Sequence, residues 1–226
     1  GNLARKLAHE IKNPLTPIQL TIDRIKNKYS GQISDDDKKN FEENLKIINN
    51  QIKQIENLVN EFSDFARMPK PTLKNHDLNK ILQENIKLLK EIDNSIEISL
   101  ISDDKKVLFK CDREQIARVF FNLIKNSIES IQQKAEKTPN LNKKISIEIT
   151  ENNDHIRMVL IDNGIGFDKV NNIKEITNPY FTTKKNGTGL GLSIVNKIVN
   201  DHNGELDFFP TSNGAKIEIN FKSHGN

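Results

Sequence analysis

Cysteine is almost absent from this sequence, and long apolar runs are missing altogether. Cys111 is the single cysteine, which excludes an intrachain disulfide framework and a cysteine-rich zinc site and favours a reducing compartment such as the cytoplasm. No run of about 18 apolar residues occurs, as a membrane-spanning helix requires, and the residues at the start of this sequence do not lead us to expect a signal peptide. We therefore expect no membrane segment in this chain.

A surplus of one charge is also missing, and so is a P-loop. The 34 basic and 31 acidic residues leave a net charge of +3, so we expect no nucleic-acid partner. The pattern Gly-x-x-x-x-Gly-Lys-Ser/Thr occurs nowhere, which excludes the P-loop nucleotidases. With 226 residues, 35% hydrophobic and 29% charged, the composition is that of a globular protein of one or two domains.

The first third of the sequence carries two long heptad patterns, in which apolar residues alternate at spacings of 4 and 3. This is the pattern of a helical-bundle seam. The first seam predicts a helix over residues 3–28, and the second a helix after Ser34-Asp35-Asp36-Asp37, which resembles a capping box. Together they predict an antiparallel hairpin. The seam residues are Ile11, Leu15, Ile18, Ile22, Ile25 and Tyr29, then Phe41, Leu45, Ile48, Ile52, Ile55, Val59 and Phe62.

A single hairpin offers each seam only one partner helix. Burial of one Leu, Ile or Phe stabilises a protein by roughly 1.5–3 kcal/mol, and two helices alone would leave part of this unrealised. Ile47, Leu58 and Phe65 widen the apolar face of the second helix. We therefore predict a homodimer in which two hairpins form a four-helix bundle. The alternative is that this face packs on the C-terminal part of the same chain.

Residues 7–17, Leu-Ala-His-Glu-Ile-Lys-Asn-Pro-Leu-Thr-Pro, carry reactive groups on the first predicted helix. His9 lies off the apolar seam and should face water, with the Glu10 carboxylate beside it and the Asn13 amide one turn away. Pro14 removes a backbone donor and should loosen or bend the helix. A histidine in this position is also consistent with an ordinary surface residue, so its interpretation depends on the rest of the chain.

The helical pattern ends at Arg67, and two closely spaced prolines, Pro69 and Pro71, predict a stiff linker over residues 68–76. Beyond it, helical and strand patterns mix without regular β-α-β alternation. This predicts an α+β domain over residues 77–226, with helices on one face of a mixed sheet. Helices are predicted after Asp77 and Asp112 and over 190–201, and strands over 96–101, 107–109, 145–149, 156–161, 205–209 and 215–221.

Two polar motifs of this domain suit nucleotide chemistry. Asn122 and Asn126 lie on one helix face, and amide oxygens can bind a hard cation such as Mg²⁺ that also bridges phosphates. Asp162 follows a strand directly and could accept a hydrogen bond from an exocyclic amine, while Gly164 and Gly166 would let a flat ring approach the backbone. Each motif has an ordinary alternative, namely capping amides and an Asn-Gly hairpin turn.

Two further motifs follow in residues 178–192. Residues 178–184, Asn-Pro-Tyr-Phe-Thr-Thr-Lys, mix aromatic, hydroxyl and cationic side chains, and alone would be consistent with a packed loop. Residues 187–192, Gly-Thr-Gly-Leu-Gly-Leu, lead into a predicted helix. Backbone amides at the start of a helix bind phosphate well when no side chain is in the way.

In this order the four motifs resemble the N, G1, F and G2 boxes of the sensor histidine kinases, and residues 7–17 are similar to their H box. The resemblance spans nearly the whole chain, and residues 7–17 look most like the nitrogen-regulation (NtrY-like) type. It implies a dimerisation and histidine phosphotransfer domain at 1–67 and an ATP-binding α+β sandwich of the histidine kinase/GHKL type at 77–226. It also implies a cytoplasmic location, free or as the cytoplasmic part of a membrane-anchored bacterial sensor.

The resemblance implies a role for each matching residue. His9 would be phosphorylated from ATP, with Glu10 taking the proton of its ring, and the phosphoryl group would pass to an aspartate of a response regulator. Asn13 would orient a water for the reverse activity, dephosphorylation of the regulator. Asn126, assisted by Asn122, would hold Mg²⁺. The residues implied to bind ATP are Asn122, Asn126, Asp162, Gly164, Gly166, Phe181, Thr182, Lys184, Gly187, Thr188, Gly189, Leu190, Gly191 and Leu192.

The sequence departs from the family pattern at Glu129, where many members carry a basic residue. Residues 167–188 would form a lid over ATP, and Lys184 or Lys185 of that lid is the expected substitute near the terminal phosphates. Two other functions stay open. One is a different ATPase of the same superfamily, such as a chaperone or gyrase relative, against which the hairpin with His9 argues. The other is a non-catalytic dimeric scaffold with a degenerate ATP site, against which the four intact motifs argue.

Overall fold

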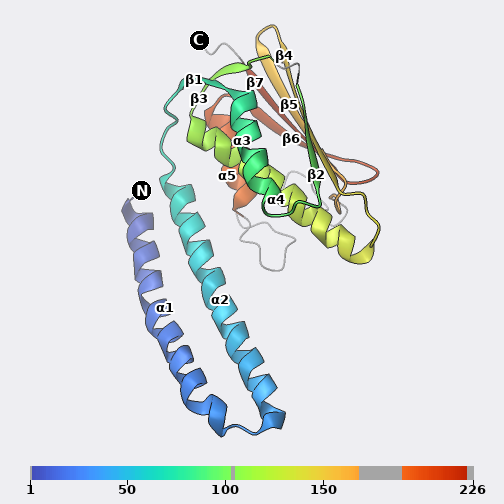
Figure 1. Ribbon diagram of the computed structural model, residues 1–226. Coiled ribbons are helices and arrows are strands. Elements are labelled where there is room, and N and C mark those ends of the chain that lie inside the picture. Colours follow the sequence, from blue (N-terminus) through green and yellow to red (C-terminus); the bar gives the residue numbers. More distant parts are fainter. Residues whose placement is uncertain (1, 103–104, 168–189, 223–226) are drawn as a thin grey trace. The chain divides into compact units, whose positions relative to one another are not determined.

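The computed structural model describes residues 2–102, 105–167 and 190–222 (Figure 1). The chain forms two compact units, and the division between them falls after Pro69, inside the predicted linker. Across the described ranges, no helix combines the length and the apolar character that a bilayer crossing requires.

The first unit is a helical hairpin, as the heptad patterns predict. Its first helix continues through Pro14 and Pro17 without interruption. Ser34 is the N-cap residue of the second helix, but the prediction that its hydroxyl bonds to a free backbone amide of that helix is wrong. The Ser34 hydroxyl donates to Asp37 Oδ2 at 3.1 Å and caps no backbone amide. The elements are α1 (Asn2–Tyr29), η1 (Ser30–Gln32) and α2 (Asp35–Arg67).

Alternate positions of the two seams are buried within the hairpin, and those between them are exposed. The buried residues, 4–9% exposed, are Ala8, Leu15 and Ile22 of α1 and Leu45, Ile52 and Val59 of α2. The isoleucines between them, 38–45% exposed, are Ile11, Ile18, Ile48 and Ile55. The hairpin thus closes around one apolar stripe and leaves a second stripe open. We call this second set of four isoleucines the open stripe.

The second unit has three helices on one face of a five-stranded sheet (Figure 1). Its elements are β1 (Lys74–Asp77), α3 (Leu78–Lys90), β2 (Glu97–Ile101), β3 (Leu108–Cys111), α4 (Arg113–Lys137), β4 (Lys144–Asn152), β5 (His155–Asp162), α5 (Gly191–Asp201), β6 (Glu205–Pro210) and β7 (Ala215–Lys222). The sheet order is β2-β4-β5-β7-β6, with β2 and β4 parallel and the other neighbours antiparallel. This confirms the predicted α+β architecture and mixed sheet.

Strand β1 was not predicted, because it lies in the segment assigned to the linker. Residues 74–77 read Lys-Asn-His-Asp and pair antiparallel with β3. They carry no apolar alternation and none of them is buried, so the sequence has no strand signal there. The pairing with β3 forms a separate two-stranded sheet.

Side chains at helix ends fix the helices against one another. Asp112 is the N-cap of α4, as predicted, and its Oδ1 accepts from the Gln115 amide at 3.2 Å. His202, just beyond α5, is 5% exposed. Its Nε2 accepts from the Asp112 amide at 3.0 Å, so its Nδ1 carries the proton and donates to the Ile198 carbonyl at 2.8 Å. One imidazole therefore ties the end of α5 to the start of α4.

Candidate functional site

Asp162 ends β5 and is a buried, hydrogen-bonded carboxylate of the second unit. Its side chain is 5% exposed. Its Oδ2 accepts from Ser127 Oγ at 2.7 Å, and its Oδ1 accepts from the Gly164 amide at 2.9 Å. Burial raises the pKa of this carboxyl, while the bonds from Ser127, Gly164 and Ala215 oppose the rise. The result is a rigid, desolvated acceptor that can bind an amine N–H.

The glycines after Asp162 are required by packing of the protein against itself. A Cβ on Gly164 would lie 2.2 Å from Ser130 Oγ. Gly166 has a φ of +69°, and a Cβ there would lie 2.7 Å from the Gly214 carbonyl oxygen. Protein atoms thus fill the space that a side chain would need at both positions. The approach of a flat ring to this part of the backbone stays a prediction.

One face of α4 connects this loop to the start of α5. Asn122, Asn126 and Ser130 follow at intervals of four residues and so share that face. Asn122 Nδ2 donates to the Gly191 carbonyl at 3.4 Å, and Ser130 Oγ accepts from the Ile165 amide at 2.9 Å. Asn126 lies between these contacts and is half-buried. Of the predicted pair of amides, Asn122 therefore contacts the start of α5, and both lie on the helix that supports Asp162.

Sequence reasoning missed Ser127 and Ser130, although one of them left a signal. Ser127 is 2% exposed and lies on the buried stripe of α4, where its neighbours Leu123, Ile124, Ile128 and Ile131 are apolar. A hydroxyl that interrupts such a stripe must find a polar partner, and here that partner is Asp162. Ser130 left no comparable signal, because its role depends on how closely the loop at Gly164 approaches.

The start of α5 is built differently from the loop after Asp162. Leu190 is fully buried, whereas Gly191 and Leu192 are half-buried. Among the residues that the structure describes, no atom lies within 4 Å of a Cβ built on Gly191, so their packing does not require glycine at this position. The first amides of α5 form the kind of helix N-terminus that attracts anions. The other predicted ATP-binding residues, Phe181, Thr182, Lys184, Gly187, Thr188 and Gly189, lie outside the described residues, as does Lys185.

The site offers amide oxygens to a divalent cation. Among the described residues no group of three or more His, Cys, Asp or Glu side chains could hold a metal ion. The amide nitrogen of Asn122 is engaged with Gly191, which leaves its Oδ1 as the ligand atom. One or two amide oxygens suit Mg²⁺, which keeps several waters and binds phosphates at the same time. The residues present therefore fit this ion.

The predicted phospho-acceptor lies on the other unit. His9, Glu10 and Asn13 are all exposed on α1, whereas the neighbouring Ala8 is buried against α2. This confirms that His9 faces solvent, as its position off the seam predicts. An exposed imidazole beside a carboxylate can react with a partner that approaches from outside the hairpin.

Comparison with known proteins identifies a family for each part of the chain. The family described as "Histidine kinase-, DNA gyrase B-, and HSP90-like ATPase" matches residues 111–224, and "His Kinase A (phospho-acceptor) domain" matches residues 1–71. The chain is 37% identical over 222 residues to an NtrY-like sensor histidine kinase of Rickettsia bellii, covering 98% of this chain and 35% of that protein. It is 34% identical over 230 residues to nitrogen regulation protein NtrY of Azorhizobium caulinodans, covering 100% and 29%.

The chain thus spans about a third of the length of these curated relatives. Among solved structures, histidine kinase ThkA in complex with response regulator protein TrrA resembles it with a TM-score of 0.67 and 24% identity. That match covers 99% of this chain and 62% of the other, and it supports the fold. The chain belongs to the histidine kinase-, DNA gyrase B- and HSP90-like ATPase family, and within it to the sensor histidine kinases, whose phospho-acceptor domain it carries in residues 1–71.

Proposed function

We propose that this chain is an ATP-dependent protein-histidine kinase that phosphorylates His9 and transfers the phosphoryl group to an aspartate of a response regulator. One observation carries the proposal: a single chain combines the exposed His9–Glu10 pair with the buried Asp162 carboxylate and its fixed donors. The similarity to named sensor histidine kinases, and to one solved with a response regulator, supports it. We place its action in the cytoplasm, free or as part of a membrane-anchored sensor.

In this proposal the nucleotide site has two ends. Asp162 accepts from the exocyclic amine of adenine, and its buried position makes that bond selective because water cannot replace it. The first turn of α5, from Gly191, binds phosphate oxygens through backbone amides. Asn126 and Asn122 hold Mg²⁺, which offsets the phosphate charge when bound. The proposed ATP-binding set also keeps, on the strength of their motifs, Phe181, Thr182, Lys184, Gly187, Thr188 and Gly189.

The proposed reaction is an in-line transfer at the γ-phosphorus. A ring nitrogen of His9 forms a P–N bond while the bond from phosphorus to the bridging oxygen breaks, so ADP leaves with that oxygen. The other ring nitrogen gives its proton to Glu10. The protein's contribution is positioning and electrostatic stabilisation rather than covalent chemistry of its own.

Incubation with γ-labelled ATP and magnesium tests this function. We expect an acid-labile, base-stable label on the protein that is absent from His9→Gln and reduced in Asp162→Asn. His155→Gln is the matched control, because His155 is an exposed histidine outside both sites and should retain the label. A label of the same size on His9→Gln would contradict the proposal.

Asn13 is proposed to orient the water that dephosphorylates the regulator. It lies four residues from His9 on α1 and is exposed, so it reaches the same surface. Release of phosphate from a phosphorylated receiver domain should therefore fall in Asn13→Ala. Full phosphatase activity in that variant would exclude this role.

We also propose that the hairpin forms a homodimer through the open stripe. Ile18→Glu places a charge in this stripe and should give a monomer by light scattering. Thr16→Glu adds the same charge at an exposed position two residues from Ile18, on a different face of the same helix, and should leave the dimer intact. A dimer that survives Ile18→Glu would show that another surface holds the protomers together.

A further inference from the structure

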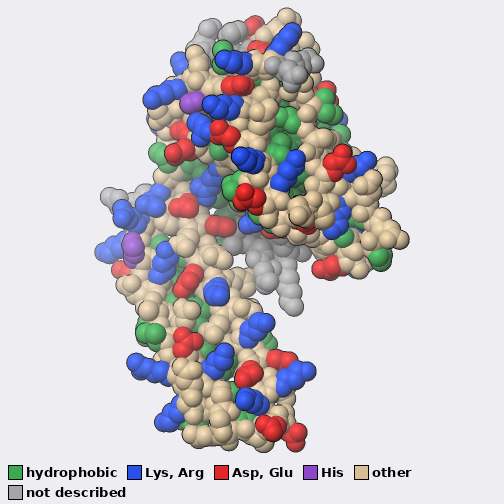
Figure 2. All heavy atoms as spheres, viewed as in Figure 1, with side chains coloured by type: hydrophobic (Ala, Val, Ile, Leu, Met, Phe, Trp, Pro, Cys, Tyr) green, Lys and Arg blue, Asp and Glu red, His purple; other side chains and the backbone are tan. Residues whose placement is uncertain are grey.

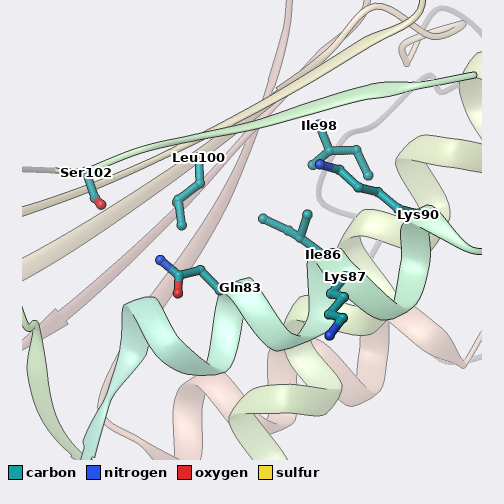
Figure 3. A pocket seen from close by; sticks show the side chains of 7 residues that line it. All are labelled: Gln83, Ile86, Lys87, Lys90, Ile98, Leu100 and Ser102. Atoms are coloured by element: carbon teal, nitrogen blue, oxygen red, sulfur yellow. The ribbon is translucent and has the colours of Figure 1, made fainter. Parts of the chain in front are cut away.

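A pocket of about 370 Å³ lies between α3 and β2 and shares no residue with the nucleotide site (Figure 3). Its apolar part comes from Ile86 on α3 and from Ile98 and Leu100 on β2. In Figure 3 the side chains of Ile98 and Leu100 both extend from the strand toward the helix. The pocket therefore follows alternate residues of one strand.

That strand is at the edge of the sheet. Among the described strands, β2 pairs with β4 alone. The Glu97 amide donates to the Lys143 carbonyl at 3.0 Å, on the β4 side. Because successive backbone groups of a strand point to opposite edges, the amides of Ile98 and Leu100 point to the unpaired edge. The same two residues thus present both apolar side chains and main-chain donors.

The edge lacks the features that usually prevent strand addition. Proteins commonly protect an edge strand with lysine, proline or a bulge. Strand β6, at the opposite edge, carries Asp207 in its middle and ends at Pro210. Strand β2 reads Glu-Ile-Ser-Leu-Ile, with no lysine or proline, and Ile101 on it is 55% exposed.

The rim of the pocket adds charge and polarity at defined places. Lys90 extends from α3 so that its ammonium lies beside Ile98, and Gln83 lies opposite Leu100 (Figure 3). Lys87 also borders the pocket, but its ammonium points away from β2 (Figure 3). Figure 2 shows hydrophobic side chains among basic ones on the face that carries α3 and β2. A ligand suited to this rim is apolar near Leu100 and anionic near Ile98.

We propose that β2 binds an extended peptide segment that adds as a new strand along its free edge. The main chain of the segment pairs with Ile98 and Leu100, alternate apolar side chains enter the pocket, and one carboxylate meets Lys90. This is strand addition, in which main-chain bonds supply affinity and the pocket supplies selectivity. The partner class is therefore an extended, amphipathic, acidic segment.

The test uses the full chain and a blocked peptide, Val-Thr-Val-Thr-Glu, with its sequence-reversed form to cover both strand directions. Binding should slow hydrogen exchange at the amides of Ile98 and Leu100, measured by NMR, while the Glu97 amide, already bonded to β4, changes little. The same peptide N-methylated at the bonds that face β2 should not bind. Methylation at the alternate bonds should be tolerated.

Charge variants test the anionic contact. Lys90→Glu should weaken binding of the glutamate peptide by about three- to fivefold, the upper part of the range of an exposed ion pair, and should strengthen binding of a peptide of the same sequence with lysine in place of its glutamate. Lys87→Glu is the matched control and should change neither. Equal effects of the two substitutions would overturn the assignment of Lys90. Protection that appears with rising protein concentration and without peptide would overturn the proposal in favour of self-association at this edge.

Discussion

Removal of the Ser127 hydroxyl tests whether Asp162 is held as a desolvated carboxylate. Ser127→Ala deletes the 2.7 Å bond to Oδ2 and leaves the Gly164 amide as donor to Oδ1. Ser127 is 2% exposed and Asp162 is 5% exposed, so bulk water does not easily replace the lost donor. The substitution replaces the Ser127 hydroxyl with a hydrogen atom and leaves the apolar packing of α4 in place.

The size of the effect depends on the charge of Asp162. A hydrogen bond to a charged group contributes about 1.5–3 kcal/mol, and one between neutral groups about 0.5–1.5 kcal/mol. Ser127→Ala should therefore lower the free energy of unfolding by about 2 kcal/mol where Asp162 is ionised. Where Asp162 is protonated, the loss should be about 1 kcal/mol.

The direction of the pH dependence follows from the raised pKa. Burial places the pKa of folded Asp162 above its unfolded value, so its contribution to stability is greatest below the unfolded pKa and is lost as pH rises through the folded one. The Ser127 bond opposes that rise. Its removal moves the folded pKa higher still, and the variant should lose stability over a wider pH range than the wild type.

Urea unfolding at several pH values, with NMR titration of the Asp162 carboxyl, measures both effects. Ser130→Ala is the matched control, since it removes a hydroxyl of the same helix that accepts from the Ile165 amide and does not contact the carboxylate. The loss of unfolding free energy in Ser130→Ala should not depend on whether Asp162 is ionised. If the Ser127→Ala loss were equally independent of pH, Asp162 would not be a charged group supported by Ser127, and the reasoning would fail.

Three further substitutions probe other parts of the second unit. In Gly214→Ala the new Cβ would lie 2.0 Å from the Asp162 carbonyl oxygen, so stability should fall by about 1–3 kcal/mol or more and nucleotide affinity with it; unchanged urea unfolding would contradict this. Gly191→Ala should keep full stability, because the Cβ meets no atom of the described part of the chain, yet weaken ATP binding by calorimetry; equal affinity would exclude a phosphate at this position. Arg157 lowers the pKa of Glu218 to about 2, so the advantage of wild type over Glu218→Gln should be present above the ordinary pKa of 4.5 and vanish as pH falls toward 2. Because Arg157 is 46% exposed, that advantage is only about 0.5–1 kcal/mol in thermal unfolding, and a constant difference at all pH values would refute the pairing.

The long elements could be predicted because their patterns are strong and local. Heptad spacing predicts α1 and α2, and aspartates before apolar runs predict the starts of α3 and α4, where Asp77 and Asp112 are indeed the N-caps. Strands β4 and β5 alternate clearly enough to be recognised. Strand β1 could not be predicted in this way, since its partner β3 lies more than 30 residues away and its own residues are polar.

The sequence identified the candidate ligand-binding residues of the site, but not the residues that hold them in place. Motifs identified Asp162 and the two asparagines, because their residue types suit an amine and a cation. They did not identify Ser127 and Ser130, whose roles arise only when α4 packs against the loop after β5. Motifs also identified Gly164 and Gly166, but not the close approach of Ser130 and Gly214 that requires glycine at these positions. A local motif shows which chemical groups are present. It does not show which segments distant in the sequence come into contact when the chain folds.

Each heptad seam is divided into buried and exposed residues, and the exposed ones determine how stable a homodimer of the hairpin can be. Each isoleucine of the open stripe is 38–45% exposed, so covering it would contribute about 0.6–1.2 kcal/mol, that fraction of the value for full burial. Eight such residues in two protomers would contribute about 5–10 kcal/mol, against an association cost of about 4–15 kcal/mol. The open stripe alone therefore leaves a dimer near the margin. Tyr29, which is 42% exposed, and half-buried Ile25 and Phe62 continue the same heptad seams, and they must add to the contact for the dimer to be stable. Because association then depends on every member of this surface, one buried charge per protomer, as in Ile18→Glu, is enough to separate the hairpins.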